Sequence, residues 1–177
     1  MLWGHSAKTY WIHLFPAHWV RLFNKECRSG YPQEIAARKT MHSLPPDTMN
    51  ATPDLPYSLV IPAYNEEKRI RPLFDAIGCF DGELIVVCDG TDSTAQVVGE
   101  ISRTRSDLVI RCLTFGHRLG KGGGVIAGLS AARAPLVGFF DADGSTTISE
   151  MMRLFSCLAE HDGAIGSRWV AGSTLAV

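Results

Sequence analysis

The stretch VGFFDADGS, residues 137–145, decides how the rest of this chain is interpreted, because an apolar run stops there at two carboxylates one residue apart. If residues 137–140 form a buried strand, the period of two directs Asp141 and Asp143 to the same side where the strand ends. Paired carboxylates suit Mg²⁺ or Mn²⁺ carrying a diphosphate, since these ions bind carboxylate and phosphate oxygens. A solvated Asp-rich turn is the alternative and is favoured for the motif taken alone.

Composition limits the classes of protein to which the chain can belong. Its 177 residues, 46% of them hydrophobic, suffice for one core, so we expect a single ordered domain. The net charge is −1 and no basic stripe is present, which disfavours a nucleic-acid partner. The five cysteines include no C-x-x-C pair, which is typical of reduced thiols in an intracellular protein.

Residues 1–56 differ from the rest, and we expect an N-terminal extension that ends in a proline-rich linker. Apolar residues recur at helical spacing over 11–23, which predicts a short amphipathic helix, bent at Pro16, that could rest in a membrane interface. A poorly ordered extension is the alternative. No apolar run reaches the length of about 18 residues that spans a bilayer. One hypothesis is that translation begins at Met49.

From Tyr57 onward, strand-like apolar segments alternate with segments of helical periodicity. We predict that Asp92 and Ser149 cap the second and fourth helices. The pattern predicts an α/β fold over 57–177: a mostly parallel, Rossmann-like sheet with helices on both faces. We expect strands over 58–61, 83–88, 108–113 and 136–140, helices over 66–77, 92–103, 122–132 and 149–160, and the start of a fifth strand at 164–166.

Polar clusters follow the first four predicted strands. In open parallel sheets, ligands bind outside the carboxyl ends of the strands, at the point where the strand order reverses. Four loops at one edge therefore predict one ligand site, although loops at strand ends are commonly polar anyway. These clusters occupy residues 62–67, 89–92, 116–124 and 141–145.

The first two loops offer groups that suit a nucleoside. Tyr64 provides a ring and a hydroxyl, and Glu66 provides an acceptor near a helix start. The structural alternative is that Asn65 caps the helix and Glu66 complements its dipole. In the second loop, Asp89 can accept a hydrogen bond from a base or a ribose hydroxyl.

The later loops offer positive charge. The glycine-rich stretch 116–129 allows backbone to approach a phosphate closely, with Lys121 as a point charge. It matches neither G-x-x-x-x-G-K-[ST] nor a G-x-G-x-x-G fingerprint, which disfavours a phosphate-binding hydrolase and a nicotinamide enzyme. Arg168 could balance charge on a leaving diphosphate, or it could be a surface arginine paired with a carboxylate.

Five motifs, in this order and spacing, resemble the nucleotide-sugar-binding half of family 2 inverting glycosyltransferases with the GT-A fold. The resemblance covers roughly residues 57–170 and is greatest to the branch that transfers mannose or glucose to dolichyl or other polyprenyl phosphates. Five ordered motifs are far more specific than one. The motifs are VIPAYNEEKRI (60–70), VVCDGTDST (86–94), RLGKGGGVIAGL (118–129), FFDADGST (139–146) and IGSR (165–168).

The resemblance implies roles for particular residues. Asp141 and Asp143 would bind ribose and a Mg²⁺ or Mn²⁺ ion, and Lys121 and Arg168 would lie near the phosphates. It further implies a nucleotide-sugar donor linked to GDP or UDP, a lipid-phosphate acceptor, and a cytoplasmic protein at the cytoplasmic face of a membrane. The residues implied to line the nucleoside pocket are Pro62, Ala63, Tyr64, Glu66 and Asp89.

The implied reaction is direct displacement at the anomeric carbon of the sugar, with Asp141, Asp143 and Arg168 as the catalytic residues. A metal on Asp143, assisted by Asp141, would neutralise the departing diphosphate. A lipid phosphate is already ionised and needs no general base, whereas a hydroxyl acceptor would need one.

The sequence departs from the family pattern in two places. Cys88 stands where the second motif usually begins with paired aspartates, and the chain ends at Val177, where the family would continue into an acceptor-binding half. A truncated, non-catalytic nucleotide-binding fragment is therefore an alternative. A sugar-phosphate nucleotidyltransferase is a weaker one, because its glycine-rich loop should follow the first strand.

Overall fold

The computed structural model describes residues 14–16 and 55–167 of the chain. Within these residues, short strands alternate with helices, as the hydrophobic pattern predicts. The elements are β1 (Leu14–Pro16), β2 (Tyr57–Ala63), α2 (Ile70–Ile77), β3 (Glu83–Cys88), α3 (Thr94–Thr104), β4 (Val109–Thr114), α4 (Gly120–Ala131), β5 (Leu136–Phe139) and α5 (Ile148–Cys157).

The strands form one sheet with the order β1-β5-β2-β3-β4. β2 is parallel to β3 and to β5, and β3 is parallel to β4, whereas β1 is antiparallel to β5. The chain proceeds outward from β2 to β4 and then returns to the other side of β2 to form β5. The strand order therefore reverses between β2 and β5, which is where this class of sheet binds ligands.

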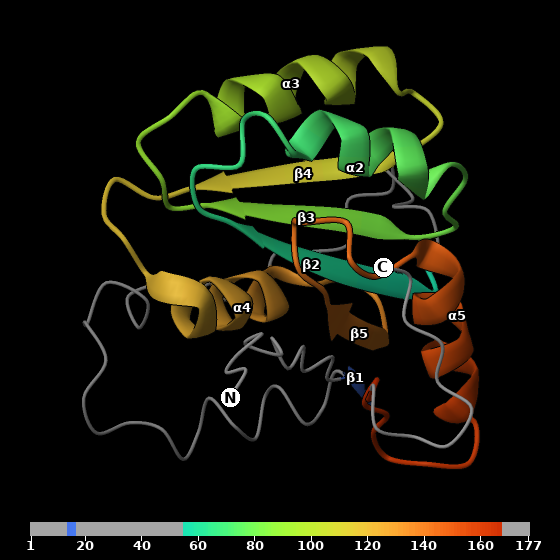
Figure 1. Ribbon diagram of the computed structural model, residues 1–177. Helices are drawn as coiled ribbons and strands as arrows, with labels where there is room; N and C mark the ends of the chain where they lie inside the picture. Colours follow the sequence, from blue (N-terminus) through green and yellow to red (C-terminus); the bar gives the residue numbers. More distant parts are fainter. Residues whose placement is uncertain (1–13, 17–54, 168–177) are drawn as a thin grey trace, which may run out of the picture.

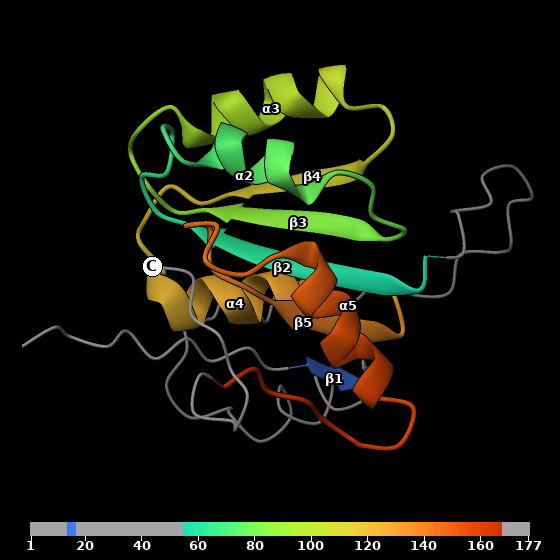
Figure 2. The ribbon, with the colours of Figure 1, turned by 45° about the vertical axis from the view of Figure 1, so that its right-hand side comes forward.

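Helices cover both faces of the sheet, with α2, α3 and α5 on one face and α4 on the other (Figure 1, Figure 2). The larger core lies between the sheet and helices α2, α3 and α5. It includes Leu59 of β2, Phe74 of α2 and Met151 of α5. The smaller core joins Val60 of β2 to Val125 of α4. This arrangement confirms the predicted mostly parallel α/β fold.

Helix α4 lies very close to the sheet because of its glycines. A Cβ atom on Gly128 would lie 2.2 Å from Cγ1 of Val60, and one on Gly124 would lie 3.3 Å from Cβ of Pro62. Real Cβ atoms do not approach a neighbour as closely as the first of these distances, so Gly128 is required by packing. Part of the glycine-rich stretch therefore positions the start of α4 beside the end of β2.

The predicted helix over residues 11–23 is wrong at residues 14–16, which form strand β1. β5 would otherwise present an unpaired edge, and β1 pairs with it, Leu14 opposite Gly138 and Pro16 opposite Leu136. Proline is tolerated there because an edge strand does not need every N–H group. The rest of the predicted helix lies outside the described residues.

The starts of helices α2 and α5 and the expected fifth strand differ from the predictions. α2 begins at Ile70 rather than at residue 66, since the preceding residues form a turn in which Arg69 N donates to Glu66 O. Thr147 caps α5, its hydroxyl accepting from Glu150 N at 3.2 Å, so the predicted cap at Ser149 is wrong. The fifth strand expected at 164–166 is limited, in the described part of the chain, to an isolated bridge at residue 164.

A buried carboxylate ties the amino ends of the strands together. Glu83 is 0% exposed, and its Oε1 accepts from Ser58 Oγ at 2.6 Å and from Arg133 N at 2.7 Å. Its Oε2 accepts from Arg111 Nη1 at 2.9 Å. Burial alone would raise the pKa of Glu83, but the hydrogen bonds and the guanidinium charge outweigh it and lower this pKa.

None of the helices in the described residues combines the length and the hydropathy that crossing a bilayer requires.

Candidate active site

A cleft of about 430 Å³ opens at the carboxyl ends of β2, β3 and β5, at the reversal of strand order. Its volume lies within the usual range for small-molecule sites, roughly 300–1,000 Å³. Four loops that are distant in the sequence contribute to it. The lining residues are Pro62, Ala63, Tyr64, Glu66, Arg69, Asp89, Arg118, Gly120, Lys121, Asp141, Ala142 and Asp143.

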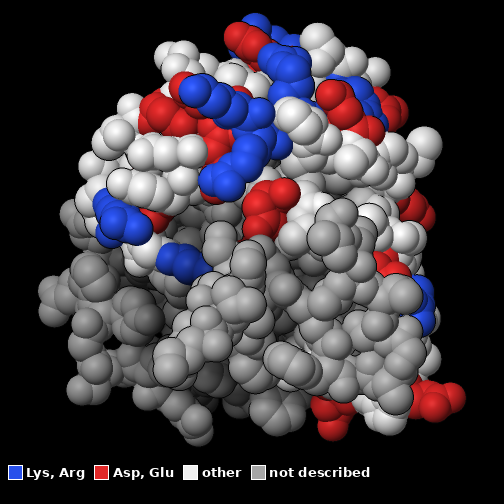
Figure 3. Space-filling model, viewed as in Figure 1, with Lys and Arg blue, Asp and Glu red and all other residues white. Residues whose placement is uncertain are grey.

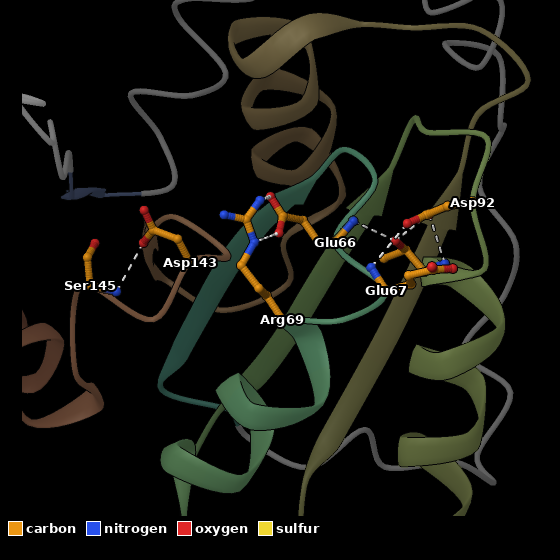
Figure 4. A network of polar contacts seen from close by, with 7 residues as sticks. Glu66, Glu67, Arg69, Asp92, Asp143 and Ser145 are labelled. Carbon is orange, nitrogen blue, oxygen red and sulfur yellow. Dashed lines mark hydrogen bonds and ion pairs between the residues drawn. The ribbon is translucent and has the colours of Figure 1, made fainter.

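One side of the cleft pairs an aromatic ring and a carboxylate with arginines. The guanidinium carbon of Arg118 lies 4.2 Å from the centre of the Tyr64 ring, and that tyrosine is 42% exposed. Arg69 Nε and Nη2 donate to the two carboxylate oxygens of Glu66 at 2.6 and 2.9 Å. Figure 4 shows this pair with Asp143 on one side of it and the Glu67–Asp92 network on the other.

The loops that follow β2 and β3 are joined by hydrogen bonds. Glu66 N donates to Thr94 Oγ1 at 2.8 Å, and Glu67 N donates to Asp92 Oδ2 at 3.1 Å. In the other direction, Ser93 N donates to Glu67 Oε2 at 3.2 Å. These bonds hold the Tyr64 loop against the start of α3.

Asn65 also joins the loops that follow β2 and β3. It has φ +56°, a conformation that asparagine adopts more readily than most residues. Its Oδ1 accepts from Thr91 N at 2.9 Å and from Asp92 N at 3.3 Å, so it supports the second loop and does not cap α2. A Cβ atom on Gly90 would lie 2.4 Å from that same oxygen, which explains the glycine.

Asp92 receives several hydrogen bonds. Its Oδ1 accepts from the backbone N of Thr94 at 3.0 Å and from the hydroxyl of Thr94 at 2.6 Å. The carboxylate therefore binds the first residue of α3, but the N-cap position is Ser93, so the predicted N-cap at Asp92 is wrong by one residue. Burial acts to raise the pKa of Asp92, but the bonds from Thr94 and Glu67 N outweigh it and lower this pKa.

Asp89, directly after β3, accepts hydrogen bonds from backbone amides at the start of α4. Its Oδ2 accepts from Leu119 N at 2.7 Å and from Gly120 N at 2.9 Å, and the residue is 7% exposed. Two of the amide groups that could approach a phosphate are therefore already bound to a carboxylate. Arg118, Gly120 and Lys121 of this segment line the cleft, and the two cationic side chains are its charged groups there.

The Asp141 loop forms the opposite side. Lys121 Nζ lies 2.7 Å from Asp141 Oδ1 and 2.9 Å from Oδ2, with side-chain exposures of 55% for the lysine and 18% for the aspartate. Asp143 Oδ1 accepts from Ser145 N at 3.0 Å, and Figure 4 shows that contact. Gly144 has φ +72°, which allows the tight turn after the second carboxylate.

The cleft suits a divalent cation that arrives with an anionic substrate. It is lined by four carboxylates, of Glu66, Asp89, Asp141 and Asp143, and by three basic side chains. In the described part of the chain, no three His, Cys, Asp or Glu residues converge as a complete protein metal site. Mg²⁺ and Mn²⁺ commonly need only one or two carboxylates, taking their other ligands from phosphates and water, so the Asp141–Asp143 pair fits them.

Opposite charges adjoin one another on this part of the surface. Figure 3 shows acidic and basic side chains intermixed where they are described on the face seen in Figure 1. A nucleotide diphosphate that entered the cleft would meet both the cations of the α4 loop and the carboxylates of the Asp141 loop.

The structure brings together all but one of the predicted site residues. Pro62, Ala63, Tyr64, Glu66, Asp89, Lys121, Asp141 and Asp143 all line the cleft. Arg168 lies outside the described residues. Arg69 and Arg118 line the cleft and were not predicted. Each lies inside a recognised motif, next to a predicted residue in space, but a single arginine carries no signal of its own.

Cys88 does not line the cleft. It is buried in the larger core, and its sulfur lies 3.7 Å from that of Cys112 on the neighbouring strand. The contact with the second thiol, together with burial, raises the pKa of Cys88. The residue in the usual aspartate position therefore belongs to the core of this chain.

A family model and two curated relatives that match this chain are all glycosyltransferases. The model of the family described as "Glycosyl transferase family 2" matches residues 58–175. A dolichyl-phosphate beta-glucosyltransferase, ALG5D of Trichomonas vaginalis, is 35% identical over 126 residues, covering 64% of this chain and 38% of that protein. Dolichyl-phosphate beta-glucosyltransferase of Drosophila melanogaster is 34% identical over 140 residues, covering 68% and 43%.

Among solved structures, residues 1–349 of S. aureus TarS match with a TM-score of 0.50 and 27% identity, covering 59% of this chain and 32% of that chain. The chain thus spans less than half the length of each of these relatives.

Proposed function

We propose that this chain, which belongs to glycosyl transferase family 2, is the donor-binding part of a transferase that moves a hexose from a nucleotide sugar to a polyprenyl phosphate. The observation on which this depends most is the cleft at the reversal of strand order, where the aromatic residue of the first loop and the paired carboxylates of the last lie around one cavity. The relatives named dolichyl-phosphate glucosyltransferases support glucose as the sugar and dolichyl phosphate as the acceptor.

The nucleoside is proposed to bind on the side formed by the first two loops. Tyr64 presents an exposed ring, and Glu66 and Asp89 present carboxylate oxygens that can accept from a base or a ribose. The hydrogen bonds between these loops fix the positions of those groups, which reduces the conformational entropy lost when a ligand binds.

The diphosphate is proposed to lie toward the Asp141 loop. Asp141 and Asp143 are the residues that would bind Mg²⁺ or Mn²⁺, and the bound ion would supply charge stabilisation for the departing diphosphate. Lys121 and Arg118 line the same cleft and can bind phosphate oxygens. Arg168 is proposed as a further cation near the phosphates on the strength of the sequence motif alone.

The acceptor is proposed to be an anionic lipid phosphate, which attacks the anomeric carbon without help from a base. The bond from the sugar to the nucleotide diphosphate breaks as the bond to the lipid phosphate oxygen forms, so the leaving group departs as the free nucleoside diphosphate. A lipid acceptor would place the protein at a membrane surface, and we propose its cytoplasmic face, where nucleotide sugars are available.

The position of the glycine-rich stretch favours this function over a sugar-phosphate nucleotidyltransferase. That stretch begins α4, after β4, whereas the first parallel strand, β2, leads into the Tyr64 loop. Nucleotide-sugar binding without turnover is the second candidate, because the groups that line the described cleft account for a nucleotide and a cation and none of them is assigned to an acceptor.

Donor binding and transfer can be measured separately. We expect isothermal titration calorimetry to show binding of UDP-glucose or GDP-mannose in the presence of Mn²⁺. Donor labelled in the sugar, incubated with the chain and dolichyl phosphate, should then yield label in the lipid extract. Binding without transfer would support the second candidate, and failure of both donors to bind would contradict the proposed function.

A further inference from the structure

The contact between Lys121 and Asp141 joins two groups to which the proposed function assigns different ligands. The ammonium group lies within 2.9 Å of both oxygens of the carboxylate. The same oxygens are the ones that a divalent cation would need, and the same ammonium group is one that a diphosphate would attract. The ion pair therefore engages the negative charge that a divalent cation would require and the positive charge that a diphosphate would require.

We propose that Lys121 competes with the divalent cation for Asp141, so that the cation binds more tightly once a nucleoside diphosphate has drawn the lysine away. The inference rests on the proposed function for the identity of the nucleotide, but not for the competition between the two cations. A second cation cannot approach a carboxylate that is paired on both oxygens without first displacing its partner or sharing it at the cost of charge repulsion.

The lysine is suited to this exchange because it is exposed. Its side chain is 55% exposed and is attached near the amino end of α4, so it can change partner without disturbing the core. Exposed ion pairs contribute little to stability, and breaking one shifts a competing equilibrium only about two- to fivefold. The contact can therefore lower the affinity for the cation without preventing its binding.

The arginine at the other side of the cleft provides a matched control. Arg69 also lines the cleft and also bears a positive charge, but its ion pair is with Glu66, at 2.6 Å. Removing either charge reduces the general repulsion of a cation. Only removal of Lys121 frees the oxygens of Asp141.

The test is a Mn²⁺ titration of the 177-residue chain, without nucleotide, in which electron paramagnetic resonance reports the free ion. Binding elsewhere on the chain is defined with the double variant Asp141→Asn, Asp143→Asn. We expect Lys121→Met to raise the Mn²⁺ affinity about two- to fivefold above that of the native chain, and Arg69→Met to raise it less.

The same titration with saturating UDP or GDP completes the test. The gain from Lys121→Met should disappear, because the diphosphate has already displaced the lysine in the native chain. Equal gains from both single variants, or no gain from Lys121→Met, would overturn the inference. If neither nucleotide binds, the proposed function fails, and the nucleotide-free comparison alone decides whether Lys121 and the ion compete. Thermal unfolding curves confirm that the variants remain folded.

Discussion

The two ends of the sheet use carboxylates in opposite ways. At the amino end, Glu83 is fully buried, and both of its oxygens accept hydrogen bonds from the protein. At the carboxyl end, Asp141 and Asp143 line an open cleft, and Asp141 is paired with an exposed lysine. The difference indicates that a carboxylate that accepts from several groups of the fold has a structural role, whereas one paired with an exposed lysine can exchange that partner for a ligand.

The largest expected loss of stability comes from removing the hydrogen bonds of Glu83 at the amino ends of the strands. Glu83→Ala removes the acceptor of the Ser58 hydroxyl and of Arg133 N, and it leaves Arg111 with the carbonyl of Ala131 but without its paired carboxylate. We therefore expect the free energy of unfolding to fall by about 3 kcal/mol or more. Urea unfolding measures this loss. Glu100→Ala is the control, because it removes the partner of Arg71 in an exposed pair and should cost less than about 1 kcal/mol. Similar losses for the two variants would show that the buried carboxylate of Glu83 stabilises the fold no more than an exposed ion pair does.

At the carboxyl ends of the strands, the hydrogen bonds of Asn65 join the loops that follow β2 and β3, and substitutions of Asn65 test how much these bonds stabilise the fold. Asn65→Ala removes the acceptor for two backbone N–H groups at a positive φ, so we expect a loss of about 1–2 kcal/mol in unfolding free energy. Asn65→Gly removes the same acceptor but tolerates the conformation, and it should cost less. If the glycine variant is the less stable of the two, the positive φ does not limit this position.

The smallest effect concerns acid stability. The pKa of Asp92 is lower in the folded chain than in the unfolded one, so its contribution is complete above the unfolded pKa of about 3.9 and is lost as pH falls through the lower, folded value. Asp92→Asn should therefore lose less unfolding free energy than the native chain between about pH 6 and about pH 2. An unchanged pH profile would show that this carboxylate contributes no proton linkage.

Hydrophobic periodicity predicted the parallel strands, the intervening helices and the edge of the sheet where the cleft lies. It failed at residues 14–16, because pairing with the edge of β5 is a long-range contact that no local pattern reports. It also misplaced the start of α2, because Glu66 and Glu67 are bound to the β3–α3 loop. Local propensity cannot account for partners so far away in the chain.

Motif recognition located most of the lining of the cleft but not its ion pairs. Tyr64, Asp89 and Asp141 could be predicted because they follow strands whose ends share one edge. That Asp89 binds the first amides of α4, and that Arg118 stacks on Tyr64, depends on side-chain geometry. Sequence spacing contains no such information.

We have proposed that the carboxylates at the end of β5 bind a cation together with a nucleoside diphosphate. The most direct measurement is calorimetric titration of UDP and of GDP into the native chain and into Asp143→Asn, each with and without Mn²⁺. We expect Mn²⁺ to strengthen binding of one nucleotide at least tenfold in the native chain and to have little effect in the variant. The variant should keep its fold, because asparagine can still accept from Ser145 N. Equal strengthening in both chains, or none in either, would contradict the proposal.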